Sequence, residues 1–475
     1  MIGRIKEIQL LKDALQDDKS HFIAVYGRRR VGKTYLISEA FDYRFTFHHA
    51  GMAEGGLEAQ LFEFEASIKN ANGKEPKKKP QNWLEAFEDL KDLIRDSSEK
   101  KKVIFIDELS WMDTPKCDLI PALESFWNGF ASVRKDIILI VCASATSWMI
   151  SKVIHNKGGL YNRLTEQISL KPFTLSECEE MVRFKELSLT REQILQYYMI
   201  FGGIPFYWTF LKKGLSLSQN IDEILFSSEA PLRDEFKYLY ASIFRNPEVY
   251  LTIIDTLSTK KVGMTREEII EFSGITNSGD LSTKLEELES CGFIRKYNAF
   301  GMKKKNAVYQ LIDCFTLFYY KFLAAEPTDE HFWSNQINTP AINSWMGLAF
   351  ERVCLDHVPQ IKQRLGISGV YTEVNSWYCK ADPDNGVFGS QIDLLIVRKD
   401  QVINLCEMKY SSAEYTVTDK VDRSIRNKIN DLKICTKTKY AIHPTLVTPY
   451  GLVDNSYSGN IQAVITMDDL FDKVR

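Results

Sequence analysis

One stretch of the chain combines residue types and a spacing suited to binding phosphate. It reads Gly27-Arg28-Arg29-Arg30-Val31-Gly32-Lys33-Thr34 and lies between the apolar run 22–26 and a helical pattern at 35–40. Glycines let backbone N–H groups curve round a β-phosphate, and the start of a helix adds the positive end of its dipole. We predict that these eight residues line a nucleotide site, with Lys33 on the β- and γ-phosphates and Thr34 on Mg²⁺. A glycine-bearing turn with a solvent-facing lysine is the alternative, and the order strand, loop, helix favours the nucleotide site.

Two acidic residues, Asp107 and Glu108, end the continuous apolar run 103–106. Such a run is typical of a buried parallel strand, and ligands bind open α/β sheets at the carboxyl ends of their strands. We predict that Asp107 holds Mg²⁺, usually through water, and that Glu108 polarises the attacking water as general base. Helix capping is the alternative role for both carboxylates.

Two further polar positions follow strand patterns. The apolar run 136–143 ends in Ser144-Ala145-Thr146, so Ser144 or Thr146 could contact a γ-phosphate from the neighbouring strand tip, or only cap a helix. Arg163 precedes another strand-like run, and it could stabilise transition-state charge in cis or in trans. A surface salt bridge is an equally compatible role for this arginine.

The composition is that of a globular protein. The chain has 475 residues, enough for about three domains of ~150 residues. Its apolar runs are shorter than the ~20 residues of a membrane span, its N-terminus lacks a signal-peptide pattern, and its nine cysteines form no Cys-x-x-Cys pair, so we expect a cytoplasmic protein with reduced thiols. The formal net charge of −3 gives no global attraction to nucleic acid, so DNA binding would rely on local basic runs such as 303–305.

The motifs of the first half resemble those of the archaeal-type ATPases, a family in the STAND branch of the AAA+ relatives. The resemblance rests on GRRRVGKT, on FIDE at 105–108, on LYNR and LKPF at 160–173, and on Gly202-Gly203-Ile204-Pro205. It implies an α/β P-loop NTPase core over 1–175 and a helical lid over 176–245, with ATP and Mg²⁺ as cofactors. It also implies a nucleotide-controlled switch, with Gly203 and Pro205 of the lid near the nucleotide.

The segment 246–314 has the rhythm of a winged helix. Helical patterns at 251–257, 265–270 and 281–290 precede a two-stranded wing with Lys303-Lys304-Lys305 at its turn, and Thr265 with Glu268 forms a capping-box pattern. The third helix carries Asp280, Glu286, Glu287 and Glu289 against Lys284 alone. Since carboxylates repel a polyanion, we favour an inter-domain role for this helix over DNA reading.

A second group of chemically active residues lies in the domain 341–475, beyond a predicted linker at 315–340. Strand patterns at 391–397 and 402–409 form a hairpin, which places Glu407 and Lys409 on one face and Asp393 across the ladder. Two carboxylates can bind Mg²⁺ or Mn²⁺, and a lysine can orient or deprotonate a water that attacks a phosphodiester. The alternative is a buried carboxylate–lysine ion pair.

This spacing resembles the PD-(D/E)xK restriction-endonuclease-like fold, an α/β domain in which a mixed sheet is flanked by helices. The resemblance implies that Glu351 is the acidic residue of the first helix, although Ile392 stands where the name-giving motif has proline. Basic residues of the helical pattern 418–435 could follow a DNA backbone or face solvent, namely Lys420, Arg423, Arg426 and Lys428.

Together these patterns predict an ATP-hydrolysing switch whose nucleotide state controls a Mg²⁺-dependent, nuclease-like domain that acts on DNA. One alternative is a regulatory ATPase whose winged helix and catalytically silent nuclease fold bind DNA or a protein partner. A hexameric remodeller is another alternative, but no pore-loop signature is present in the sequence. We also hypothesise that Arg28, Arg29 and Arg30 link the nucleotide state to an acidic surface such as Glu286-Glu287.

Overall fold

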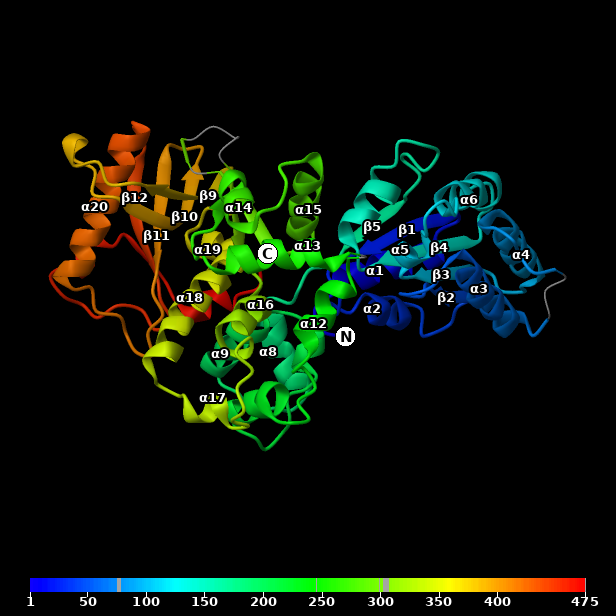
Figure 1. Ribbon diagram of the computed structural model, residues 1–475, viewed down its shortest axis with the longest axis horizontal. Helices are drawn as coiled ribbons and strands as arrows, with labels where there is room; N and C mark the ends of the chain where they lie inside the picture. Colours follow the sequence, from blue (N-terminus) through cyan, green and yellow to red (C-terminus); the bar gives the residue numbers. More distant parts are fainter. Residues whose placement is uncertain (75–77, 245, 299, 302–306, 475) are drawn as a thin grey trace. The chain divides into compact units, whose positions relative to one another are not determined.

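The computed structural model describes residues 1–74, 78–244, 246–298, 300–301 and 307–474 (Figure 1). The chain folds into two compact units. The first comprises Met1–Pro172 and a short segment that begins at Leu239, and the second comprises Phe173–Tyr238 and the chain from Asn246 onward. In the described ranges, none of the helices has both the length and the apolar character that spanning a bilayer requires.

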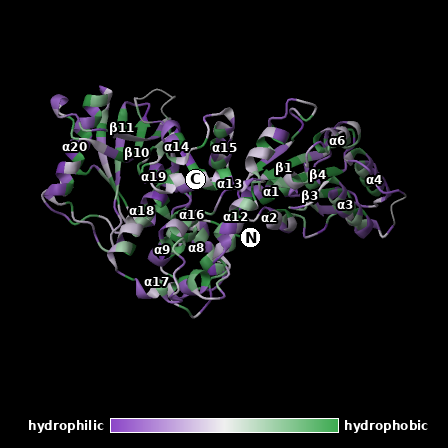
Figure 2. Cartoon of the chain, viewed as in Figure 1, coloured by the Kyte–Doolittle hydropathy of each residue, from purple (hydrophilic) through white to green (hydrophobic). Residues whose placement is uncertain are grey.

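The first unit contains a five-stranded parallel sheet in the order β2-β3-β4-β1-β5. Its strands are β1 (His21–Tyr26), β2 (Phe47–Ala50), β3 (Lys102–Asp107), β4 (Ile137–Ala143) and β5 (Glu166–Ser169). The strand that precedes the phosphate loop, β1, and the strand that ends in acids, β3, are therefore separated by β4. The three main apolar runs form strands as predicted, and Figure 2 shows β1, β3 and β4 as hydrophobic.

Both faces of this sheet are covered, as the continuous apolar runs require. Phe22 and Ala24 of β1 pack into one core with α3 and α4, whereas Ile23 and Val25 are equally buried on the other face. Asn82 caps α4 by accepting a hydrogen bond from the backbone N–H of Glu85. The helical elements of this unit are α1 (Ile5–Gln16), α2 (Lys33–Ala40), α3 (Leu57–Asn72), α4 (Trp83–Asp96), α5 (Leu109–Met112), α6 (Leu119–Phe126), η1 (Trp127–Ala131), α7 (Thr146–Trp148) and η2 (Met149–Ile154).

The second unit begins with the helical segment that we predicted as a lid. Its elements are α8 (Leu175–Phe184), α9 (Arg191–Phe201), α10 (Pro205–Trp208), α11 (Leu217–Ile221), η3 (Asp222–Phe226) and α12 (Glu235–Ala241), where the chain passes back to the first unit. Gly202 ends α9 and Pro205 begins α10, which are the breaks that the sequence predicts. Gly203 is required for close packing, because a Cβ there would lie 1.8 Å from the carbonyl oxygen of Phe173.

The segment 315–340, predicted as a linker, instead contributes to a packed core. It contains α16 (Cys314–Phe318), η5 (Tyr319–Leu323) and α17 (Phe332–Asn335). The physical reason is its aromatic content: the Phe315 ring stacks on Phe201 at 6.4 Å, and the Phe318 ring lies 6.3 Å from that of Phe226. These rings attach the segment to the helices of the predicted lid, so the two form part of one unit.

Three helices and a small antiparallel sheet follow, in the part that we predicted as a winged helix. They are α13 (Pro247–Ser258), β6 (Met264–Thr265), α14 (Arg266–Ser273), α15 (Gly279–Ser290), β7 (Ile294–Tyr297) and β8 (Val308–Leu311), with the sheet order β6-β8-β7. The Thr265–Glu268 capping box forms as predicted, and a third strand, β6, joins the expected pair. Lys303-Lys304-Lys305 lie outside the described residues.

The C-terminal part is a five-stranded mixed sheet in the order β13-β12-β11-β10-β9. The predicted hairpin is present as β10 and β11, and α20 packs Leu432 into the core of the sheet with Trp377 and Leu395. The elements are α18 (Pro340–Asp356), α19 (Val358–Arg364), β9 (Thr372–Cys379), η6 (Pro383–Asn385), β10 (Ser390–Arg398), β11 (Val402–Met408), α20 (Asp419–Thr436), β12 (Ala441–Val447), η7 (Ser458–Asn460), β13 (Ala463–Ile465) and α21 (Met467–Leu470).

Candidate functional sites

The loop after β1 has a glycine at two positions where the backbone favours one. Gly27 adopts a φ of 147°, and a Cβ there would lie 2.2 Å from the carbonyl oxygen of Leu170. Gly32 adopts a φ of 90° and precedes α2, which begins at Lys33. The first N–H groups of α2 therefore point toward the loop with the positive end of the helix dipole, as anion binding requires.

The Lys33 side chain lies inside this loop, and the residue is only 6% exposed. Nζ donates to the carbonyl oxygens of Gly27 at 3.0 Å and Arg28 at 3.1 Å, and to Oγ of Ser144 at 3.0 Å. A solvent-facing lysine, the alternative reading of the motif, is therefore wrong. Three oxygen acceptors surround the ammonium, and the phosphate oxygens of a nucleotide are acceptors of the same chemical kind.

Thr34 and Asp107 form a pair of oxygen ligands suited to Mg²⁺. The Thr34 hydroxyl donates to Oδ2 of Asp107 at 2.6 Å, across the gap between α2 and the end of β3. A hydroxyl and a carboxylate at this distance fit the hard oxygen ligands that Mg²⁺ prefers. The residues predicted to hold the ion thus lie together, although they are 73 positions apart.

Ser144 connects the phosphate loop to Glu108. The register places Tyr26 opposite Ala143 and Ile106 opposite Val141, so the loop, Ser144 and the two acids leave the sheet at one edge. Ser144 Oγ donates to Oε1 of Glu108 at 2.6 Å, and its backbone N–H donates to Oε2 at 3.1 Å. The sequence predicted a phosphate contact for Ser144. It did not predict these two hydrogen bonds to Glu108, because nothing in the local pattern identifies the partner.

The other predicted residues of the first site have different surroundings. Thr146, the second hydroxyl candidate, begins α7 and is buried. Arg28 is buried, whereas Arg29 and Arg30 are half-buried. Pro205 belongs to the second unit, so its contact with nucleotide stays a prediction. Glu287, part of the acidic surface hypothesised for the arginines, accepts a hydrogen bond from Tyr250 within its own unit.

Arg163 lies at the wrong edge of the sheet for a role in cis. It is exposed and precedes β5, whose amino end is fixed by the N–H of Thr165 donating to the carbonyl oxygen of Phe22. Because β1 and β5 run parallel, this is the end of β1 opposite the phosphate loop. Six residues of β1 span about 20 Å, which an arginine side chain does not bridge. The role in trans stays a prediction.

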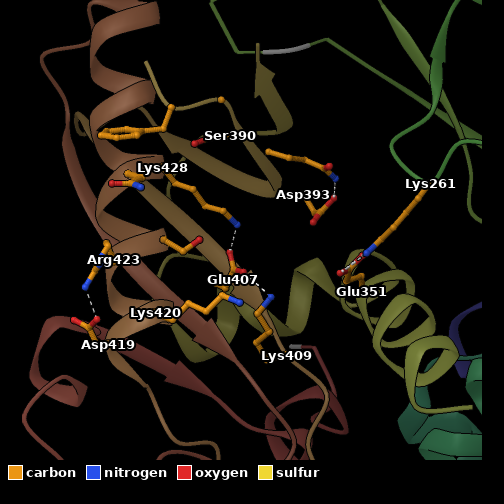
Figure 3. A pocket seen from close by; sticks show the side chains of 15 residues that line it. Lys261, Glu351, Ser390, Asp393, Glu407, Lys409, Asp419, Lys420, Arg423 and Lys428 are labelled. Atoms are coloured by element: carbon orange, nitrogen blue, oxygen red, sulfur yellow. Dashed lines mark hydrogen bonds and ion pairs between the residues drawn. The ribbon is translucent and has the colours of Figure 1, made fainter. Parts of the chain in front are cut away.

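The second candidate site is a pocket of about 530 Å³ at the mixed sheet (Figure 3). Its lining includes all four residues that the sequence predicts, namely Glu351, Asp393, Glu407 and Lys409. The hairpin register pairs Leu394 with Cys406, which places Asp393 opposite Glu407 as expected. Residues of one face of α20 complete the lining, among them Lys420, Arg423 and Lys428.

Each carboxylate in this pocket already has a partner. Glu407 Oε1 lies 2.7 Å from Lys409 Nζ, and its Oε2 lies 2.6 Å from Lys428 Nζ. Both oxygens of Glu351 lie 2.9 Å from Lys261 Nζ, and Oδ1 of Asp393 accepts from the Gln391 amide at 2.7 Å. In the described ranges, no three His, Cys, Asp or Glu side chains converge as a group that could hold a metal ion.

Burial and charge act in opposite directions on these acids. Burial by itself would raise the pKa of Glu407, but the ammonium groups of Lys428 and Lys409 outweigh it, and the pKa is lowered. Burial raises the pKa of Glu351, and the nearby Asp393 carboxylate raises it further, against the effect of Lys261. Of these two acids, Glu407 is therefore the one more firmly held in its charged form.

A buried hydrogen-bond network attaches the small sheet to this pocket. Arg295 of β7 donates to the side chains of Gln310 at 2.6 Å and Ser376 at 2.7 Å, and Ser376 Oγ donates to the backbone carbonyl of Asp393 at 2.5 Å. Burial, together with the neighbouring Arg352 guanidinium, lowers the pKa of Arg295 to about 10. Sequence analysis missed both Lys261 and Arg295, because neither belongs to a recognisable motif.

Two family models match parts of the chain. Residues 1–209 match the model of a family described as an ATPase domain predominantly from Archaea, and residues 315–421 match a family of archaeal and bacterial proteins of unknown function. The chain is 23% identical over 435 residues to the uncharacterized protein MJECL04 of Methanocaldococcus jannaschii, covering 90% of this chain and 91% of that protein.

Two solved structures are also similar. The Walker-type ATPase PABY2304 of Pyrococcus abyssi has 15% identity and a TM-score of 0.46, with 67% of this chain and 95% of that chain covered. The ORC2 protein of Aeropyrum pernix has 13% identity and a TM-score of 0.41, with 75% and 95% covered. These values are too low to transfer a function. From the family match and the phosphate loop, we conclude that the N-terminal part of the chain is a P-loop ATPase domain.

Proposed function

We propose that the chain hydrolyses ATP with Mg²⁺ at the carboxyl edge of its parallel sheet. One observation carries the proposal: Ser144 joins Lys33 to Glu108 directly beside the Thr34–Asp107 pair. Lys33 binds the β- and γ-phosphates, while Thr34 and Asp107 hold Mg²⁺, which when bound neutralises phosphate charge. Glu108 orients the attacking water and takes up its proton.

The same contacts support a nucleotide-controlled switch. Lys33 and Ser144 bond to each other and to protein oxygens, and a bound nucleotide competes for Lys33. When Lys33 turns to phosphate, Ser144 loses one partner but keeps its two hydrogen bonds to Glu108, which orient that carboxylate toward the water. We propose that this exchange, together with Pro205 in the lid and Arg163 acting in trans, couples nucleotide state to the rest of the chain.

Two variants test the ATPase. Lys33→Ala should abolish nucleotide binding measured with a fluorescent ATP analogue, because it removes the buried ammonium. Glu108→Gln should retain binding and reduce phosphate release by about 10²- to 10⁴-fold, the usual contribution of a general base. Equal ATP affinity and turnover in wild type and Lys33→Ala would refute the assignment.

We also propose that the second unit binds DNA at the mixed-sheet pocket. The observation in favour is that four basic residues line one cavity, since basic side chains bind phosphate: Lys409 after β11, and Lys420, Arg423 and Lys428 of α20. The resemblance to PD-(D/E)xK domains implies Mg²⁺ or Mn²⁺ and cleavage. The carboxylates as arranged do not fit a divalent metal, since lysines hold both Glu407 oxygens and Lys261 donates a hydrogen bond to Oε1 of Glu351. We therefore favour the regulatory alternative, in which the nuclease-like fold binds DNA or a protein partner without cutting.

A cleavage and binding assay on one preparation separates the two forms of this proposal. Wild type should bind a labelled DNA duplex and leave plasmid intact with Mg²⁺ or Mn²⁺ in each ATP state. Plasmid cleavage that disappears in Glu407→Ala would instead support the nuclease. Absence of DNA binding at low salt would refute the DNA proposal and leave the ATPase proposal untouched.

A further inference from the structure

Lys428 occupies an unexpected place in the mixed-sheet pocket. Its side chain is only 17% exposed, less than half the exposure of Lys409 at 38%. It comes from α20 rather than from the hairpin, and it reaches Oε2 of Glu407 at 2.6 Å while Lys409 holds Oε1 at 2.7 Å (Figure 3). Glu407 therefore has an ammonium group on each oxygen, and this three-residue cluster carries one net positive charge.

A divalent ion on Glu407 would either share an oxygen with one of these ammonium groups, against their charge repulsion, or displace it. A metal shared by Asp393 and Glu407 needs an oxygen from each, and the Glu407 oxygen that faces α20 is held by Lys428. The displaced lysine would remain within the pocket, where its charge repels the ion. Displacement would also leave a lysine, 17% exposed at present, without its carboxylate partner, which is costly.

The polar groups around Lys428 suit an anion instead. Ser424 and Asn427 of α20 line the same pocket and can donate hydrogen bonds, and Lys420 adds a further charge. The first turn of α20 begins at Asp419 in the same lining, so the positive end of the helix dipole lies near the pocket.

We propose that Lys428 is the resident cation of this pocket: its ammonium takes the place of a divalent metal on Glu407, and the pocket binds a phosphate group without metal. This inference rests on the proposed binding of DNA for the identity of the ligand, but the competition with metal concerns the chain's own residues. Lys428 is thus a specificity-determining residue that selects phosphate against Mg²⁺ or Mn²⁺.

Mn²⁺ binding, followed by electron paramagnetic resonance on the full chain with the metal ligand of the ATP site removed by Asp107→Ala, tests the competition. Lys428→Met should raise Mn²⁺ affinity on the order of tenfold or more, because one positive charge next to the ion is removed. Lys428→Arg keeps the charge and should bind Mn²⁺ as weakly as the parent. Lys420→Met is the matched control, since it removes an exposed lysine from the same helix and pocket, and it should change affinity by less than about threefold.

DNA binding provides the second arm. In EDTA, the parent should bind a fluorescein-labelled duplex, and Lys428→Met should weaken binding more than Lys420→Met does. Tight Mn²⁺ binding by the parent that Lys428→Met leaves unchanged or weakens would overturn the proposal. If the duplex fails to bind while Lys428→Met still raises Mn²⁺ affinity, the DNA assignment fails and the competition stands. Circular dichroism of each variant separates these results from loss of fold.

Discussion

Replacing Ser144 with alanine tests the link between Lys33 and Glu108. Ser144 is 2% exposed, and its hydroxyl bonds to an ammonium at 3.0 Å and to a carboxylate at 2.6 Å. A hydrogen bond to a charged group contributes about 1.5–3 kcal/mol. Lys33 keeps two carbonyl acceptors and Glu108 keeps the backbone N–H of residue 144. We therefore expect a folded variant that is less stable by about 2 kcal/mol without nucleotide.

The same substitution should tighten ADP binding. ADP must draw Lys33 away from Ser144, and it lacks the γ-phosphate that Ser144 could contact. Removing a competing bond of about 1.5 kcal/mol predicts roughly tenfold higher ADP affinity. ATP turnover should fall about tenfold, because Glu108 loses one of the two groups that orient it.

Titration calorimetry with Mg–ADP and urea unfolding measure both effects. Thr146→Val is the matched control, because Thr146 is the other hydroxyl at this strand end and its Oγ1 has no hydrogen-bond partner in the described part of the chain. That variant should bind ADP like wild type. An unchanged or weaker ADP affinity in folded Ser144→Ala would refute the competition between Ser144 and nucleotide.

Three further predictions concern the stability of each unit. Gly27→Ala should destabilise the first unit by about 3 kcal/mol or more in urea unfolding, since the Cβ would lie 2.2 Å from the Leu170 carbonyl oxygen, whereas Gly129→Ala, with open space at its Cβ, should not. Burial lowers the pKa of His357 from 6.5 to about 4, so the stability that its neutral form contributes is lost as pH falls from 6.5 toward 4. Unfolding of the second unit at pH 5 should be easier than at pH 7 by about 2 kcal/mol, and His357→Gln should remove most of this difference. Glu407→Gln should lower the free energy of unfolding by about 2–3 kcal/mol at pH 7 and by less near pH 4. The reason is that folding lowers the pKa of Glu407, so its carboxylate stabilises the fold above the unfolded pKa of 4.5, and this stability is lost on acidification.

Much of the fold follows from local pattern. The apolar runs that end at Tyr26, Asp107 and Ala143 are strands because both faces of their sheet are covered, and the loop after β1 follows from its glycines and lysine. The hairpin around 398–401 and the cap at Thr265 were equally predictable, since each depends on residues within a few positions of one another.

The unpredicted features depend on the order of strands and on packing between distant segments. Ser144 contacts Glu108 because β4 lies next to β3, and Lys428 contacts Glu407 because α20 covers that part of the sheet. Neither arrangement leaves a periodic signal in the sequence. The predicted linker was misread for a similar reason: the partners of Phe315 and Phe318 lie about a hundred residues upstream, among the helices of the predicted lid.

The strand order β2-β3-β4-β1-β5 also has a consequence for synthesis of the chain. The neighbours of β1 are β4 and β5, which end at Ala143 and Ser169, so β1 has no sheet partner while the first hundred or so residues emerge from the ribosome. Parallel pairing between such distant segments forms slowly, and an unpaired apolar strand can form non-native contacts in the meantime. The nucleotide loop is thus encoded early and assembled late, and a ribosome-bound fragment that stops before β4 should not retain ATP.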